Sequence, residues 1–390
     1  MAATSTLTSP VASPPAAPRT VPWYIWCAVL AVTSAMIGGH WDISWHRSIG
    51  RDTFWTPAHI AIYLCGVLAG ISCGYLILST TFRQDSPLRP ASVSIWGFCG
   101  PLGAFVAAWG GIAMLTSAPF DDWWHNAYGL DVKIVSPPHV LLITGILAVE
   151  VGALILILGV MNRAEGAFRR KLNRLFLYIG GMILVVLMIL VMEFTTRAAM
   201  HKAFFYRILC TAVPAVLAGI GAASPRRWAS TTVAGIYTVF LLGLEWILPL
   251  FPAEPKLGPV YQHVTHFIPP EFPILLIVPA LLLDLARPAL SGLNRELQAL
   301  AAGALFLASL LAVQWPFADF LMSPLARNRI FGTLYLDYNA NPNWFIVRNV
   351  FMPADAPAHF WKEMAIALAA AVLTSRLGLA WGGWMQRIRR

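Results

Sequence analysis

Long apolar runs recur along the whole of this 390-residue chain and limit the folds that it can adopt. A helix of about twenty apolar residues is long enough to cross a bilayer. The sequence predicts ten such spans, roughly at residues 22–39, 58–80, 93–117, 139–161, 174–193, 203–222, 230–251, 272–286, 297–317 and 363–383. The eighth is short and edged by proline, so a re-entrant segment is the alternative there. The pattern indicates an all-α, polytopic membrane protein with about ten transmembrane helices.

The composition agrees with a lipid bilayer as the main surroundings. Only 12% of the residues are charged, against about 25% in soluble proteins. The net charge of +9 comes from basic residues in short loops, which we interpret as topology signals and not as a nucleic-acid surface. The five cysteines fall inside apolar runs without C-x-x-C spacing, so we expect neither disulfides nor a thiolate metal site. Residues 1–20 are expected to form a disordered tail without a secretory signal.

One polar motif occurs twice between these apolar runs. The first copy begins at Asp42 and the second at Asp121, and both read D-x-x-W-H-x-x-x-G-x-D followed by a proline, one residue and a histidine. The second copy has one extra residue before its final histidine. Each copy offers a carboxylate and two imidazoles at the edge of the predicted membrane region, where ionisable residues are functional candidates.

The basic residues predict the orientation of the chain. They cluster at 163–174, 226–227 and 387–390, which all fall on one side of ten spans. The positive-inside rule makes this side cytoplasmic, together with both termini. The nine histidines then fall at the outer side, which is the periplasm if the membrane is a bacterial inner membrane: His40, His46, His59, His125, His139, His201, His263, His266 and His359. We divide the chain into a tail (1–20), a metal-binding membrane domain with two repeated helix hairpins (21–162) and further spans with outer loops (163–390).

The spacing within each copy predicts a metal site. Asp42 and His46 are four residues apart and share one face of a helical turn, as do Asp121 and His125. A proline suits the first turn of a helix, so the histidine after each proline is expected at the start of the second or fourth span. A short loop helix and a span start then bring one Asp and two His together. These ligands suit copper, with zinc or non-haem iron less favoured, in a site with an open position. The alternative is that they are ordinary polar loop residues.

The same residues carry a resemblance to a known family. The segments DISWH (42–46), RDT (51–53) and TPAHI (56–60) resemble the copper-site signature of the C subunit of the copper membrane monooxygenases. These are the particulate methane and ammonia monooxygenases and their hydrocarbon-oxidising relatives. The resemblance implies that Asp42, His46 and His59 bind copper. It also implies a second copper site, whose family spacing is reproduced at Asp121, His125 and His139, with Asp121 where the family has Asn.

The resemblance covers about residues 25–160, and the rest of the chain departs from the family. The chain is longer than the C subunit and has more spans. It contains nothing like the soluble copper modules of the family's partner subunit. An anionic Asp121 is expected to hold a divalent metal more strongly than a neutral amide.

Several further residues are candidates for additional ligands or for positioning groups. His263 and His266 precede the eighth span, and His359 follows a proline before the tenth. Asp52 and Asp131 occupy matching places in the two copies, where they either orient ligand imidazoles or cap the following helix. The remaining candidates are His40, for which a helix-end hydrogen bond is the alternative, and Asp122. Within the spans, a Glu–Arg pair among Glu150, Arg207 and Glu245 is expected, with a proton path as the alternative.

Two functions of different classes remain. In the first, copper held by the two copies activates O2 and oxidises a small apolar substrate, with electrons from an external donor and with partner subunits or a homo-oligomer. In the second, the protein binds, senses or helps to assemble copper without catalysis. A non-haem iron hydroxylase is a third interpretation, but such enzymes carry their His boxes on the cytoplasmic side.

Overall fold

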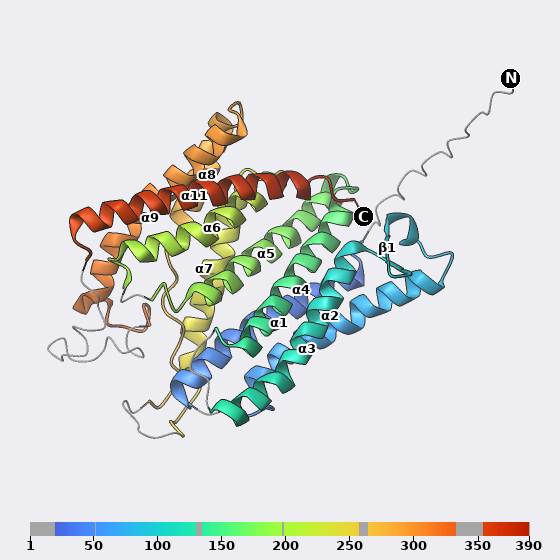
Figure 1. Cartoon of the computed structure of the whole chain (residues 1–390), viewed down its shortest axis with the longest axis horizontal. Coiled ribbons are helices and arrows are strands. Elements are labelled where there is room, and N and C mark those ends of the chain that lie inside the picture. Colours follow the sequence, from blue (N-terminus) through green and yellow to red (C-terminus); the bar gives the residue numbers. More distant parts are fainter. Residues whose placement is uncertain are drawn as a thin grey trace.

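The computed structural model describes residues 20–50, 52–129, 135–196, 199–256, 264–332 and 354–389. Helices dominate this part of the chain (Figure 1). In chain order they are α1 (Trp23–Ser48), α2 (Pro57–Phe82), α3 (Leu102–Tyr128), α4 (Pro137–Met161), α5 (Gly166–Val191), α6 (Ala203–Ala223), α7 (Ala229–Ile247), α8 (Ile277–Leu290), α9 (Arg295–Met322) and α11 (Pro357–Met385). Short 3-10 turns lie at Arg89–Ala91, Leu248–Leu250 and Pro324–Ala326.

Nine of the described helices are long and apolar enough to cross a membrane. The remaining one, α8, has 14 residues and follows an irregular segment, residues 264–276. This segment bonds to the end of α1 through Ile268, whereas Asp284 of α8 caps the start of α7 at the opposite end of the bundle. The eighth predicted span is therefore a non-helical segment followed by a short helix, an arrangement that a membrane protein tolerates where the backbone is buried in protein.

Several predicted boundaries are wrong, among them those of the first and third spans, because the edge of an apolar run is not the end of a helix. The first span was expected to end at residue 39, but α1 continues to Ser48 and carries Asp42 and His46 itself. The third was expected to begin at residue 93, where the chain instead forms an antiparallel hairpin of β1 (Val93–Ile95) and β2 (Phe98–Gly100). Trp96 and Gly97 turn this hairpin with φ of 52° and 84°. The third helix then runs from Leu102 to Tyr128, past Pro119.

The repeated helix pairs are held together by glycines. A Cβ at Gly110 of α3 would lie 2.6 Å from the carbonyl oxygen of Gly145 on α4, and one at Gly103 would lie 2.5 Å from that of Gly152. A Cβ at Gly38 of α1 would lie 2.9 Å from the carbonyl oxygen of Ala58 on α2. Small residues of this kind let membrane helices approach closely. The two helix hairpins are thus fixed close to the places where the repeated motifs lie.

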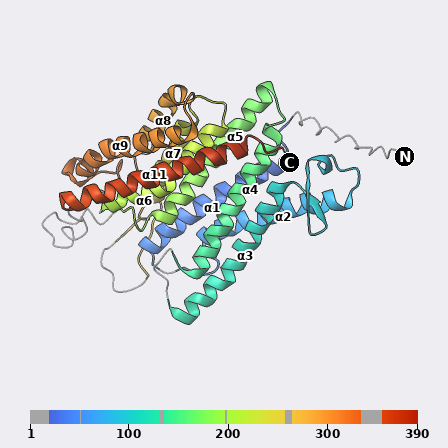
Figure 2. The same ribbon diagram turned by 45° about the horizontal axis from the view of Figure 1, so that its top comes forward.

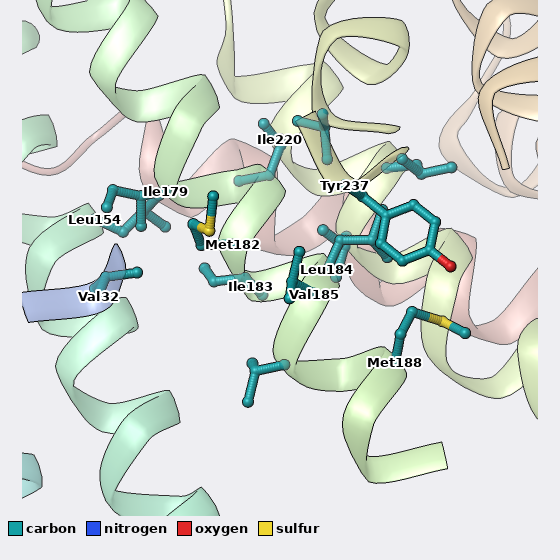
Figure 3. Packing of buried hydrophobic residues seen from close by; sticks show 14 of the residues in the cluster. Val32, Leu154, Ile179, Met182, Ile183, Leu184, Val185, Met188, Ile220 and Tyr237 are labelled. Atoms are coloured by element: carbon teal, nitrogen blue, oxygen red, sulfur yellow. The ribbon is translucent and has the colours of Figure 1, made fainter. Parts of the chain in front are cut away.

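The helices form one continuous core. α1 packs against α2, α4 and α5, and α3 packs against α2 and α4. α3 and α4 run side by side in both views of the ribbon, as do α6 and α11 (Figures 1 and 2). Where the repeated hairpins meet α5, Val32 of α1, Leu154 of α4 and Ile179 of α5 lie in one fully buried apolar layer (Figure 3). This layer connects the repeated hairpins to the rest of the bundle.

The two ends of the bundle differ in chemistry. At one end, the side-chain amide of Asn162 donates to the carbonyl oxygens of Met385 and Ile388, so the end of α4 meets the end of α11. The predicted basic clusters lie at this end, beside the starts of α1 and α5. The described histidines lie toward the other end, in the second half of α1, in the last turn of α3, at the starts of α2, α4 and α11 and in the connections before α6 and α8.

Candidate metal centre

The first cluster forms where α1 ends and α2 begins. Asp42 and His46 lie one turn apart near the end of α1. After Ser48 the chain turns at Gly50, which adopts φ 87° and donates its N–H to the carbonyl oxygen of Trp45. Such a positive φ is the usual way for a helix to end on glycine. The chain then passes Asp52 and enters α2 at Pro57, which places His59 in the first turn of that helix.

Two carboxylates and two imidazoles meet in this first cluster. The Nε2 atom of His59 lies 3.1 Å from Asp42 Oδ1 and 3.0 Å from Asp52 Oδ2. The Nε2 atom of His46 lies 3.8 Å from Asp42 Oδ2 and 3.5 Å from Asp52 Oδ2. All four side chains are largely shielded from solvent, with Asp52 only 9% exposed. Asp52 therefore contacts both imidazoles and does not cap α2.

The electrostatics of the first cluster favour an ionised Asp52. Burial by itself would raise the pKa of this carboxyl. Hydrogen bonds from His46 and His59, together with their charges, outweigh burial and hold the pKa of Asp52 well below its usual range. The cluster thus keeps a negative charge beside two ring nitrogens.

The second cluster repeats the same construction at the end of α3 and the start of α4. His125 Nε2 lies 3.5 Å from Asp121 Oδ2, and His139 Nε2 lies 3.4 Å from Asp121 Oδ1. Gly129 ends α3 with φ 87°, as Gly50 ends α1. Ser136 caps α4 by accepting the backbone N–H of His139, and Pro137 opens that helix. The predicted ligand sets Asp42/His46/His59 and Asp121/His125/His139 are therefore each brought together.

The two clusters border the same two hollows. An inner cavity of about 100 Å³ is lined by Asp42, His59, Asp121 and His139 and, on its deeper side, by apolar residues of α1, α2, α4 and α5. An adjoining polar cleft of about 440 Å³ is lined by Asp52, Asp122 and His125 among others. His59, Tyr63 and Asp121 border both. The clusters thus face a common space and not two separate ones.

The arrangement of donor atoms fits a metal ion in each cluster. Asp42 Oδ1 and Asp121 Oδ1 are buried and have no hydrogen-bond partner among the described residues, although ring nitrogens lie 3.1 and 3.4 Å away. Four donors around one ion at bond lengths of about 2.0–2.1 Å would lie about 3.3 Å from one another. Nε2 of a neutral imidazole carries either a proton or a lone pair, so the same contacts act as hydrogen bonds without a metal ion and bring the donor atoms to ligand spacing for one. Close groups of donors are formed by Asp42, His46 and Asp52 and by Asp121, His125 and His139.

The additional candidates lie in different surroundings. His40 is buried on another side of α1, where its Nδ1 lies 3.0 Å from the carbonyl oxygen of Met36. Asp122 is exposed, accepts from the side-chain amide of Asn126 and borders the polar cleft. His266 is exposed, with its Nδ1 2.8 Å from Thr265 Oγ1. His359 is exposed in the first turn of α11. Asp131 and His263 lie outside the described residues, as do residues 1–19 of the predicted tail.

Two contacts were not anticipated from the sequence. Tyr63 lies one turn after His59 on α2, and its ring centroid is 5.9 Å from that of His59. The sequence could have indicated this contact, because Tyr63 follows His59 by four residues and so shares its face of α2. The predicted intramembrane Glu–Arg pair has other members: Arg207 pairs with Glu363 of α11, and not with Glu150 or Glu245.

Comparisons with known proteins identify no relative of this chain. No protein-family model, no curated protein and no solved structure matches it.

Proposed function

We propose that this protein is a copper-dependent membrane monooxygenase-like enzyme, a divergent and longer relative of the C subunit of the copper membrane monooxygenases. It activates O2 and oxidises a small apolar substrate. One observation carries the proposal: two copies of an Asp/His/His motif face one common space whose deeper wall is apolar. Such a reaction requires a cavity with polar metal ligands at one end and an apolar wall for the substrate at the other.

The donor set favours copper over other metals. Imidazole suits copper, zinc and iron, whereas an all-carboxylate site would suit magnesium or calcium. The copper-site resemblance of residues 42–60 selects copper among the first three. Copper when bound supplies the electron transfer that O2 chemistry needs. Asp42, His46 and His59 hold it in the first cluster, and Asp121, His125 and His139 hold it in the second.

The other residues of the site position these ligands and exclude water. Asp52 contacts both imidazoles of the first cluster and so limits their rotation. Ile62, Ile143 and Ile146 give the inner cavity an apolar wall. Such a wall admits a small apolar molecule from the lipid and keeps bulk water from a reactive oxidant.

The location of the protein is part of the proposal. The basic residues at one end of the bundle favour that end as cytoplasmic, with both termini there and the metal clusters at the periplasmic face of a bacterial inner membrane. An external electron donor and either partner subunits or further copies of the chain complete the system.

A non-catalytic copper-binding, sensing or assembly protein is the second candidate. The observation that favours it is the number of carboxylates: the first cluster has both Asp42 and Asp52, and the second has Asp121 where the related family has Asn. Extra negative charge holds a divalent ion more firmly, which suits retention of the metal.

The decisive experiment is metal analysis of protein purified in native-like lipid, beside a His46→Ala/His125→Ala double variant. We expect copper in the wild type and a loss of most of it in the variant. Absence of copper from the wild type, or an unchanged content in the variant, would rule out both copper functions. Bound copper without O2 consumption, across a panel of reductants and small apolar substrates, selects the non-catalytic function.

A further inference from the structure

The inner cavity ends near a buried acid that the proposed site does not use. Glu150 lies in the middle of α4, and its side chain is 0% exposed. Neither of its carboxyl oxygens has a hydrogen-bond partner in the described part of the chain. Burial of an unpaired carboxylate is very costly, so this group is stable here in its protonated, uncharged form. An apolar side chain at this position would carry no such cost.

Glu150 lies directly beyond the floor of the inner cavity. Along α4, His139, Ile143 and Ile146 line that cavity, and Glu150 follows Ile146 by one helical turn. On α2, Ile62 lines the cavity, and Cys65, three residues further, interacts electrostatically with Glu150. Two neighbouring helices therefore place the carboxyl just below the same hollow that the metal clusters border above.

The region below Glu150 is dry core. Leu154, the next residue along the same face of α4, packs in the buried layer with Val32 and Ile179 (Figure 3). Glu150 acts electrostatically on the Cys65 thiol, and burial is the influence on the carboxyl itself. Glu150 is thus the last polar group between the cavity and the apolar interior on this side of α4.

We propose that Glu150 is a proton carrier for the cavity, an inference that rests on the proposed monooxygenase function. Insertion of one oxygen atom of O2 into a C–H bond reduces the other atom to water, which takes two electrons from the external donor and two protons. The Glu150 O–H bond breaks as its proton moves into the cavity and forms one O–H bond of that water, and the second proton comes from solvent through the polar cleft. The carboxylate then takes a new proton from solvent through the same cleft and cavity. The cavity, at about 100 Å³, has room for several bridging waters, each of which needs roughly 10–15 Å³ by this measure.

The test is the Glu150→Gln variant, with Glu245→Gln as the matched control. Glu245 of α7 is also buried, at 1% exposure, and its carboxyl oxygens also lack hydrogen-bond partners among the described residues. Its carboxyl packs on Gly332, away from the cavity lining. Glutamine keeps the size of the side chain and removes the acidic proton that a carboxyl can give up.

Infrared difference spectra between the oxidised and chemically reduced copper-loaded protein give the first measurement. We expect a carboxyl C=O band that changes on reduction, shifts in D2O, disappears in Glu150→Gln and persists in Glu245→Gln. We also expect O2 consumption to fall at least tenfold in Glu150→Gln at unchanged copper content and to recover in part in Glu150→Asp.

Two results would overturn the proposal: a band that is the same in both redox states, or O2 consumption by Glu150→Gln at the wild-type rate. If the glutamine variant does not fold, the D2O-sensitive band of the wild type and the Glu150→Asp variant decide the question. The failure of the monooxygenase function itself is recognised separately, because the wild type would then bind copper without consuming O2 while the infrared band still reports on Glu150.

Discussion

The two metal clusters are copies of one motif, yet they are braced differently. In the first cluster, two hydrogen bonds connect the end of α1 to the backbone of Ile268. Ser44 Oγ donates to the carbonyl oxygen of Ile268, and the N–H of Ile268 donates to Ser48 Oγ. Lys256 donates its backbone N–H to the carbonyl oxygen of Ile49. The second cluster stands at the end of α3, where Tyr128 and Gly129 are exposed. Its helices are held by the glycine contacts between α3 and α4.

The distances between carboxylates and imidazoles differ in the same direction. The first cluster places Asp42 and Asp52 against two imidazoles, with contacts as short as 3.0 Å. In the second cluster, Asp121 lies 3.5 and 3.4 Å from its two imidazoles. A duplicated motif can thus give a closely held site and a looser site in one protein. We expect the first cluster to bind a divalent metal more tightly than the second.

The largest expected effect is that of His59→Ala compared with His139→Ala. His59 Nε2 lies 3.1 and 3.0 Å from the carboxylates of Asp42 and Asp52, whereas the contact between His139 Nε2 and Asp121 is longer, at 3.4 Å. Loss of a residue that only supports a metal ligand weakens metal binding roughly 10–100-fold. We expect His59→Ala to weaken metal binding at the first cluster by more than this. We expect His139→Ala to weaken binding at the second cluster by a smaller factor than His59→Ala weakens it at the first. Competition with a copper chelator measures both. Equal losses would contradict the difference between the clusters.

The next effect is structural and concerns Gly145→Leu. A Cβ there would lie 2.9 Å from the carbonyl oxygen of Gly110 and 2.7 Å from Met114 Cγ. We expect α3 and α4 to separate at a cost at the upper end of the roughly 1–3 kcal/mol typical of overpacking. Thermal unfolding and metal stoichiometry would show a less stable protein that loses the second metal first.

Gly74→Leu on α2 is the control for this change, since a Cβ added at Gly74 would meet nothing within 4 Å. If both leucine variants lose the same metal and the same stability, the glycine contact does not hold the second cluster.

A smaller effect is expected for Asp52→Asn. The amide keeps the shape of the side chain but removes the negative charge that faces His46 and His59. We expect about a tenfold loss of Cu(II) affinity at the first cluster, the lower end of the effect of an outer partner. The electron paramagnetic resonance signal of that site should change while the signal of the second stays the same. A change in both signals would mean that the sites are not independent.

The smallest effect is expected for His359→Ala. His359 also follows a proline at a helix start, as His59 and His139 do, but the nearby Asp355 pairs with Lys202 and accepts the backbone N–H of Ala203. We expect the copper content to remain that of the wild type. Loss of copper from this variant would place a third ligand group at the start of α11.

The sequence predicted the parts of this structure that depend on local chemistry. Hydropathy located the helices, and the i, i+4 and Pro-x-His spacings placed Asp42, His46 and His59 together because helix geometry alone determines those positions. It left open whether Asp52 orients the imidazoles or caps α2, because the path of the chain between Gly50 and Pro57 depends on tertiary packing. It did not predict that α1 continues to Ser48, because hydropathy reports contact with lipid and not hydrogen bonding along the helix.

The same limit applies to the buried acids. Arg207 was expected to pair with a glutamate of another span, and its partner is Glu363 of α11. The choice among Glu150, Glu245 and Glu363 depends on which helices are neighbours, and α6 packs against α11. Neighbours among many similar apolar helices are set by close-packed shapes that a single sequence does not display.

The brace at Ile268 has a consequence for the order in which the sites are completed during synthesis. Ile268 follows Ser44 by 224 positions, so the last turn of α1 lacks this support until α7 and the segment after it have been made. The glycine contacts of α3 and α4 exist as soon as α4 is inserted. A metal ion that meets the growing chain would therefore find the looser site ready first, and the tighter site would form only when more than half of the protein is in the membrane.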